Sequence, residues 1–153
     1  MRFTTKTEYG MVCLIYMARR FSPNTPQVVT IREIAEIERL PEPYVAKILN
    51  KLRSAGIVSS YHGKQGGYTL ARDPARITLK EVIEALEGST FDVFCEPGVR
   101  DDIVCTHFRL CGVKLIWNRT KEILDQFYST VTVEMMVRGQ EPLKKDLVGT
   151  RGK

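Results

Sequence analysis

Apolar positions recur with a helical period at the amino-terminal end of the chain. Between Tyr9 and Met17 they fall three or four residues apart, which predicts an amphipathic helix that begins near Thr5. Thr5-Lys-Thr-Glu8 has the form of a capping box, in which Glu8 would return a hydrogen bond to the cap amide. Cys13 lies on the apolar face, so we expect it to be buried as a small hydrophobe. Two prolines soon after this stretch end the helix.

A shorter helix is predicted over residues 31–39. Thr30 would cap its first turn, with Glu33 three residues later as the return partner of a second capping box. The expected apolar contacts of this helix are Ile31, Ile34, Ala35 and Ile37. The sequence Leu40-Pro-Glu-Pro43 then breaks the chain direction and starts another helix, because proline is tolerated in a helical first turn.

The third predicted helix has an apolar stripe and a polar outer face, and Gly56 would be its C-cap residue. Its buried stripe is predicted to be Val45, Ile48, Leu49 and Leu52. Its outer face offers Ala46, Lys47, Asn50, Lys51 and Ser54. Two short helices joined by a tight turn, of which the second exposes basic and amide side chains, are typical of a helix-turn-helix.

A glycine-rich hairpin follows these helices. Residues 57–61 and 68–71 are predicted to be strands on either side of the segment 62–67, with Lys64 near its tip. Such a hairpin forms a wing that can lie against DNA phosphates or enter a minor groove. The order of helix, turn, helix and hairpin therefore predicts a winged helix-turn-helix in a mainly α protein.

Two further helices are expected in the carboxy-terminal half. Thr78-Leu-Lys-Glu81 is a capping box that begins a helix ending at Gly88. The inward side chains of that helix are predicted to be Val82, Ile83 and Leu86. Apolar residues keep a helical period over 113–131, and we expect a long helix over 113–137. Because little chain remains to cover its apolar stripe, we predict that this helix packs against a second copy of itself as a dimerisation helix.

Composition and charge favour a DNA-binding protein without a membrane-spanning segment. The chain has 153 residues, 43% hydrophobic and 27% charged, which is ordinary for a globular domain. Its longest apolar run, Met11 to Ala18, is too short to cross a bilayer, and its polar start does not resemble a signal peptide, so we expect a cytoplasmic protein. Residues 1–72 carry eleven Lys/Arg against five Asp/Glu, whereas residues 73–153 carry twelve against thirteen. A basic amino-terminal half is the pattern expected of a nucleic-acid surface.

Three of the four cysteines, Cys95, Cys105 and Cys111, lie in one short segment between two predicted helices. The segment is rich in Pro, Gly and Asp, which disfavours regular structure. In a reducing cytoplasm, clustered cysteines indicate metal binding or redox chemistry instead of a disulfide framework. The segment has no C-x2–4-C pair typical of zinc sites, and the chain has no Cys-x-x-Cys, nucleotide-binding loop or acid–base set of an enzyme. We therefore do not expect an enzyme.

Four stretches of the chain together resemble a known family. They are Met1-Arg-Phe-Thr4, residues 43–56, Ile57-Val-Ser-Ser60 and Gly66-Gly-Tyr-Thr-Leu-Ala71. These stretches resemble the Rrf2 family of bacterial transcription regulators, and the similarity covers about residues 1–135. The resemblance implies an amino-terminal winged helix, a long dimerisation helix and a homodimer that binds a double-stranded, pseudo-palindromic DNA operator. It also implies that the clustered cysteines ligate an iron–sulfur cluster, [2Fe–2S] or [4Fe–4S].

The metal ligands implied by this resemblance are Cys95, Cys105 and Cys111. Nine residues separate the first two cysteines, more than in the common family pattern, and five separate the last two. Members that control cluster assembly carry a histidine where this chain has Lys114, so that fourth ligand is absent. Glu8 occupies the place of a carboxylate that nitric-oxide-sensing members donate from the partner subunit. His107, a water or a small thiol is the alternative fourth ligand.

The resemblance also guides a prediction of the DNA contacts. They are Tyr44, Lys47, Asn50, Lys51, Arg53, His62 and Lys64. Family members often have a base-reading glutamate where this chain has Ala46, and a minor-groove arginine where it has His62. Lys47 could donate to a guanine edge or meet a phosphate. These departures indicate a different operator, and not a loss of DNA binding, because the basic residues of helix and wing remain.

We therefore expect a homodimeric repressor whose DNA binding is controlled by an iron–sulfur cluster that senses nitric oxide, redox or iron status. The expected parts are a DNA-binding domain (1–88), a sensor loop (89–112), a dimerisation helix (113–137) and a disordered tail (138–153). The alternative is a DNA-binding regulator with a zinc or thiol-redox switch and no cluster. A redox enzyme that uses Cys105 or Cys111, and a protein-interaction module that does not bind DNA, are less consistent with the motifs.

Overall fold

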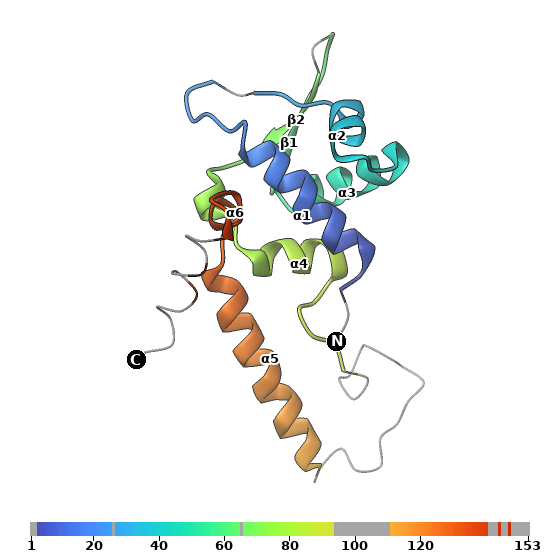
Figure 1. Ribbon diagram of the computed structural model, residues 1–153. Helices are drawn as coiled ribbons and strands as arrows, with labels where there is room; N and C mark the ends of the chain where they lie inside the picture. Colours follow the sequence, from blue (N-terminus) through green and yellow to red (C-terminus); the bar gives the residue numbers. More distant parts are fainter. Residues whose placement is uncertain are drawn as a thin grey trace.

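The chain forms a helical head with a two-stranded wing, and one long helix leaves this head (Figure 1). The computed structural model describes residues 3–25, 27–64, 66–93 and 111–140, together with 144 and 147. The elements of the head are α1 (Thr5–Ala18), α2 (Ile31–Glu38), α3 (Glu42–Ser54), β1 (Val58–Tyr61), β2 (Gly67–Leu70), the 3-10 helix η1 (Pro74–Arg76), α4 (Leu79–Glu87) and α6 (Val133–Val137). The long helix is α5 (Gly112–Thr130). This is the mainly α architecture with a hairpin wing that the sequence predicts.

The core of the head lies where α1, α3 and α4 pack together. The predicted stripe of α3 is fully buried, with exposed fractions of 0 to 1% for Val45, Ile48, Leu49 and Leu52. Burial of each such side chain contributes about 1.5–3 kcal/mol. Helices α1 and α4 approach closely at Gly10, where an added Cβ would lie 2.3 Å from Leu86 Cδ1. The small residue in the middle of α1 therefore allows this contact.

Cys13 belongs to this core and is 0% exposed, as the apolar pattern predicts. Burial, with a smaller contribution from the Glu38 carboxylate, raises the pKa of its thiol to about 12. The thiol therefore stays protonated near neutral pH, and Cys13 serves as a small core residue.

The wing consists of β1 and β2, which pair antiparallel with Val58 opposite Leu70 and Tyr61 opposite Gly67. A third piece of chain joins it, because Val29 and Tyr68 exchange backbone hydrogen bonds of 2.8 and 2.7 Å. A Cβ at Gly67 would lie only 2.4 Å from the Val29 carbonyl oxygen, so this close approach requires glycine. The sequence predicts the hairpin but not the contact with Val29.

The amino-terminal cap of α1 differs from the prediction. The Thr4 hydroxyl, and not that of Thr5, accepts a hydrogen bond from the Lys6 amide. Thr4 has extended backbone angles (φ −81°, ψ 161°), whereas Thr5 is already helical. The predicted capping box of Thr5 and Glu8 is therefore wrong. Because Thr4 and Thr5 are adjacent, the sequence is consistent with either one as the N-cap, and the helix begins after Thr4.

Helix α2 confirms one half of its predicted capping box. The Thr30 hydroxyl accepts from the Glu33 amide at 3.0 Å. The Glu33 carboxylate does not return to the cap, because it accepts a hydrogen bond from the Tyr16 hydroxyl at 2.6 Å and pairs with Arg20 at 3.6 Å. Ile37, predicted as an apolar contact of α2, is 56% exposed. The short helix contacts the core through a narrower face than the apolar pattern indicates.

Helix α4 follows the sequence prediction closely. The Thr78 hydroxyl accepts from the Glu81 amide, and the Glu81 carboxylate accepts from the Thr78 amide at 2.9 Å, so the capping box is complete. The helix ends at Gly88. The predicted inward side chains, Val82, Ile83 and Leu86, are 0 to 1% exposed.

The single helix predicted over 113–137 is in fact two helices. Val131 is extended (φ −90°, ψ 128°), and Thr132 caps the short helix α6. The carbonyl of Val131 and the amide of Val133 form hydrogen bonds of 2.8 and 2.9 Å with the backbone of residues 77–79. Both valines are buried in the head, at 5% and 0% exposure. The apolar spacing in the sequence continues across the break because Val131 and Val133 are buried in the head even though the backbone is not helical at Val131.

Most apolar side chains of α5 are uncovered. The exposed ones are Val113 (47%), Leu115 (73%), Ile116 (60%), Trp117 (37%), Ile123 (53%) and Phe127 (42%). In Figure 1, α5 extends from the head toward the end of the molecule opposite the wing. None of the described helices is both long and apolar enough to cross a membrane.

Candidate nucleic-acid interface and cysteine site

Helix α3 presents the candidate DNA-reading surface. The turn that leads into it passes through Arg39, whose left-handed backbone (φ 54°) ends α2 and turns the chain sharply. Tyr44 is half-buried, and its ring packs edge-on against Tyr9 with 5.5 Å between centroids. Lys47 is exposed, and among the described residues its ammonium has no hydrogen-bond or ion-pair partner. Lys47 is thus available to a ligand without first breaking a described contact.

Two other predicted contact residues of α3 bind each other. The Arg53 guanidinium donates to the Asn50 side-chain oxygen at 2.8 Å, and both residues are exposed. This hydrogen bond orients the Asn50 amide, whose nitrogen remains a donor. The pair therefore forms a polar unit on the outer face of the helix.

Lys51, also predicted to contact DNA, is exposed but hydrogen-bonded to another helix. Its ammonium donates to the Leu86 carbonyl oxygen of α4 at 3.2 Å. The partner lies 35 residues further along the chain, so no local sequence signal could have identified it. The structure thus separates Lys51 from Lys47, although both belong to the polar face predicted from the sequence.

The wing carries the remaining predicted DNA contacts. His62 and Lys64 are exposed beyond the end of β1, and Tyr61 at the last position of that strand is 45% exposed. The pairing of Tyr68 with Val29 attaches the base of this hairpin to the chain that precedes α2. The wing and the helix-turn-helix are therefore joined through backbone hydrogen bonds, as well as through the core.

The cysteine site lies only partly within the described residues. Cys95, Cys105 and His107 lie outside them. Cys111 is a half-buried free thiol at the N-cap of α5, and its side chain makes no cap hydrogen bond. Glu8 is exposed in the first turn of α1 and, within the part of the chain that the structure describes, has no hydrogen-bond or ion-pair partner.

Across the described ranges, no three or more His, Cys, Asp or Glu side chains gather closely enough to hold a metal ion. Of the predicted ligand set, the structure therefore places Cys111 and Glu8 individually and leaves the assembled site a prediction. Glu8 is not part of a capping box in the structure, so helix capping does not compete with its predicted role as a ligand.

The segment that leads toward the cysteines is fixed on α5. The Thr90 hydroxyl donates to the Asp125 carboxylate, and the Lys121 ammonium donates to the Ser89 hydroxyl oxygen at 3.2 Å. The ring of Phe91 packs against Trp117 with 5.9 Å between centroids. The two ends of the predicted sensor loop, residues 89–91 and Cys111, thus both adjoin α5.

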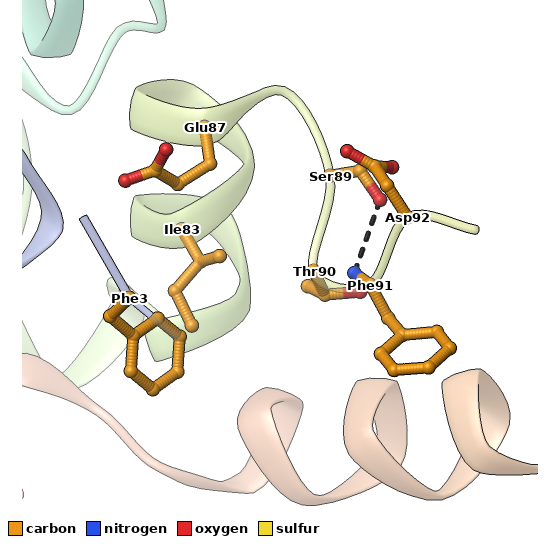
Figure 2. A pocket seen from close by; sticks show the side chains of 7 residues that line it. All are labelled: Phe3, Ile83, Glu87, Ser89, Thr90, Phe91 and Asp92. Atoms are coloured by element: carbon orange, nitrogen blue, oxygen red, sulfur yellow. Dashed lines mark hydrogen bonds between the residues drawn. The ribbon is translucent and has the colours of Figure 1, made fainter. Parts of the chain in front are cut away.

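A cleft of about 330 Å³ opens beside this segment (Figure 2). Its lining residues are Phe3, Ile83, Glu87, Ser89, Thr90, Phe91 and Asp92. Burial alone would raise the pKa of the Glu87 carboxyl, but hydrogen bonds from Thr4 and Thr7 and the nearby Lys6 ammonium lower it overall. Glu87 is therefore a carboxylate near neutral pH, and it connects the wall of the cleft to the first turn of α1.

Comparison with known proteins gives a consistent picture. The family model Rrf2, described as an iron-dependent transcriptional regulator, matches residues 3–139. The transcriptional regulator IscR of Xenorhabdus nematophila is 31% identical over 143 residues, which cover 94% of this chain and 83% of that protein. NsrR of Bacillus licheniformis is 27% identical over 149 residues, or 95% and 98% of the two chains. The solved structure of CymR, the global cysteine regulator of B. subtilis, matches with a TM-score of 0.66 at 26% identity, covering 92% of this chain and 99% of that one.

Proposed function

The chain belongs to the Rrf2 family of transcriptional regulators, and we propose that it is a homodimeric repressor whose DNA binding is controlled by an iron–sulfur cluster. Family membership makes it a DNA-binding regulator and not an enzyme. Beyond family membership, the proposal adds an iron–sulfur cluster, the signal that the cluster senses and a homodimer. The observation that carries it is the position of Cys111, the last clustered cysteine, immediately before the uncovered helix α5.

The two described members of the proposed ligand set fit the role. Cys111 is a free thiol and Glu8 an exposed carboxylate without a described partner. Thiolates together with one oxygen donor form a ligand set that iron accepts. With Cys95 and Cys105, and with Glu8 of the partner subunit, they would hold the cluster. Bound there, the cluster would supply one iron with a weak oxygen ligand, open to nitric oxide or oxygen.

The uncovered face of α5 supports a dimer. Val113, Ile116, Ile123 and Phe127 lie three, seven and four residues apart and so share one face of the helix, and each is at least 42% exposed. A stripe with this spacing packs well against a second helix of the same kind. Two heads joined in this way would address two half-sites about 34–36 Å apart on a pseudo-palindromic operator. A change at Cys111 would then alter the dimer helix and the separation of the heads.

Purification without oxygen tests the cluster. We expect a coloured protein whose visible spectrum and iron and sulfide content identify [2Fe–2S] or [4Fe–4S]. Exposure to nitric oxide should bleach it and change operator affinity, measured by fluorescence anisotropy. A colourless, iron-free protein with full, signal-independent operator binding would exclude the proposal. If the wild type is coloured, Cys111→Ser should remove the colour, because it removes a ligand, while leaving the head folded.

A regulator with a thiol-redox switch and no cluster is the second candidate. Its support is that Cys111 is a free thiol at the start of α5, where oxidation could act on that helix. CymR, the global cysteine regulator of B. subtilis, is a structural relative. In that case the anaerobic protein would be colourless, and its operator affinity would change with thiol oxidation and recover with a reductant. Stoichiometric zinc in the purified protein would indicate the zinc form of this alternative.

A further inference from the structure

The carboxyl end of α4 is a junction between three parts of the head. The Leu86 carbonyl oxygen accepts two hydrogen bonds of 3.2 Å, one from Lys6 of α1 and one from Lys51 of α3. The last turn of α4 contains no basic residue of its own. Positive charge near a helix carboxyl end is favourable because the last carbonyls lack intrahelical partners. The two lysines supply that charge from neighbouring helices. We call Leu86 and Glu87, with these partners, the α4 junction.

Glu87 completes the α4 junction on the side of α1. Its carboxylate accepts from the Thr4 hydroxyl and from the Thr7 hydroxyl, the latter at 2.6 Å, and it pairs with the Lys6 ammonium at 3.4 Å. The Glu87 side chain is only 18% exposed, so solvent weakens these interactions less than on an open surface. The carboxylate also offsets the repulsion between the two ammonium groups that share the Leu86 carbonyl.

The α4 junction continues into the segment held on α5. Gly88 ends α4, and Ser89 and Thr90 then hydrogen-bond to Lys121 and Asp125 of α5. Through the α4 junction, α3 is therefore joined by polar contacts to α1. The chain that follows the junction, at Ser89 and Thr90, extends these contacts to α5.

The three cations of α3 differ in their partners. Lys47 has none among the described residues, and Arg53 binds Asn50 on its own helix. Lys51, in the last turn of α3, binds another helix. Recognition helices contact bases mainly through residues near their amino-terminal end. A lysine in the last turn that donates to α4 is therefore better placed to hold the helix than to touch DNA.

We propose that Lys51 is a positioning residue, which fixes the recognition helix α3 on the carboxyl end of α4 and does not bind a phosphate. This inference rests on the DNA-binding function of the chain but not on the cluster. A misplaced recognition helix loses its base contacts and keeps its general attraction to phosphates. Loss of Lys51 should therefore lower operator specificity without changing the number of phosphate contacts.

The test uses the full chain and two duplexes. One duplex is selected from a random-sequence pool by the wild-type protein, and the other is a scrambled duplex of the same composition. Binding of wild type, Lys51→Met, Lys51→Gln and the matched control Lys47→Met is measured at several salt concentrations. Lys47→Met should reduce the slope of log affinity against log salt by about 0.9 for each bound head. Lys51→Met should keep the wild-type slope and lose roughly ten-fold in the ratio of selected to scrambled affinity.

Lys51→Gln retains a donor for the Leu86 carbonyl but no charge, so it should keep the wild-type slope and lie between wild type and Lys51→Met in specificity. A lower slope for both Lys51 variants, equal to that of Lys47→Met, would identify a phosphate contact and overturn the inference. Unchanged specificity in a folded Lys51→Met would overturn it too. Absence of selective binding by the wild type would instead contradict the DNA-binding function itself.

Discussion

Helices α3 and α5 have similar amphipathic patterns but opposite environments. The apolar stripe of α3 is fully covered inside one protomer, with Leu49 0% exposed. On α5, Ile116 and Ile123 are 60% and 53% exposed. Both stripes were read from the same three-and-four spacing, so the spacing identifies the apolar face of a helix but not its partner. The partner of α3 is the head, whereas in the proposed dimer the stripe of α5 would pack against a second copy of the chain.

The largest effect should come from α5. Ile123→Asp places a charge in the uncovered stripe and should convert the dimer to monomers, measured by analytical ultracentrifugation. A monomer loses the advantage of two linked heads, so operator affinity should fall by about 10²–10⁴-fold. Asn118→Asp adds the same charge at an exposed position outside the stripe and should leave both measurements unchanged. If Ile123→Asp remains dimeric, α5 is not the interface.

The covered stripe of α3 predicts a loss of fold stability instead. Leu49→Ala should lower the free energy of unfolding by about 2–5 kcal/mol, because it leaves a cavity in a packed core. Urea denaturation followed by circular dichroism measures this change. Ile37→Ala, at a 56% exposed position of the same head, serves as the control and should cost less than about 0.5 kcal/mol. Equal effects at both positions would contradict the distinction between covered and uncovered side chains.

A substitution at the break between α5 and α6 should have a smaller effect on the free energy of unfolding. The Thr132 hydroxyl accepts from the Met135 amide and so caps α6. Thr132→Ala should reduce the free energy of unfolding by about 1 kcal/mol. Hydrogen exchange should be faster in α6 and little changed in α5. Slower exchange through residues 131–133 would mean that the two helices had merged, as the sequence pattern alone predicts.

The smallest effect concerns pH at the α4 junction. The pKa of Glu87 is lowered below the ordinary 4.5, so its interactions stabilise the fold above that pH and are lost as pH falls through the folded-state pKa. Glu87→Gln should therefore be less stable than wild type at neutral pH, and the difference should shrink as the pH falls through the folded-state pKa of Glu87. Urea midpoints across this range measure the difference. A gap that persists at the lowest pH would show that the charge is not responsible.

Local signals predicted much of the fold. The stripe of α3, the capping box of Thr78 and Glu81 and the glycine-rich hairpin are all encoded within a few residues, and all are present. Each depends on the neighbours of a residue along the chain, which is the information that spacing and cap motifs contain.

Features that depend on distant partners were not predictable in this way. The contact of Val29 with Tyr68, the bond from Lys51 to Leu86 and the break at Val131 all arise from segments far apart in sequence. For the candidate site, the spacing of cysteines indicated possible ligands, and the structure adds that Cys111 begins α5. In the proposed dimer Glu8 would come from the second subunit, and the pattern of one chain does not contain that arrangement.

The anchored carboxyl end of α5 has a kinematic consequence. Backbone hydrogen bonds at Val131 and Val133 hold this end to the head, while Cys111 lies at the other end of a helix of 19 residues. Such a helix is about 28 Å long, so a rotation of about 5° about its anchored end displaces Cys111 by roughly 2–3 Å. In the proposed regulator, a shift of that size at Cys111 would thus correspond to a turn of a few degrees of the head relative to α5.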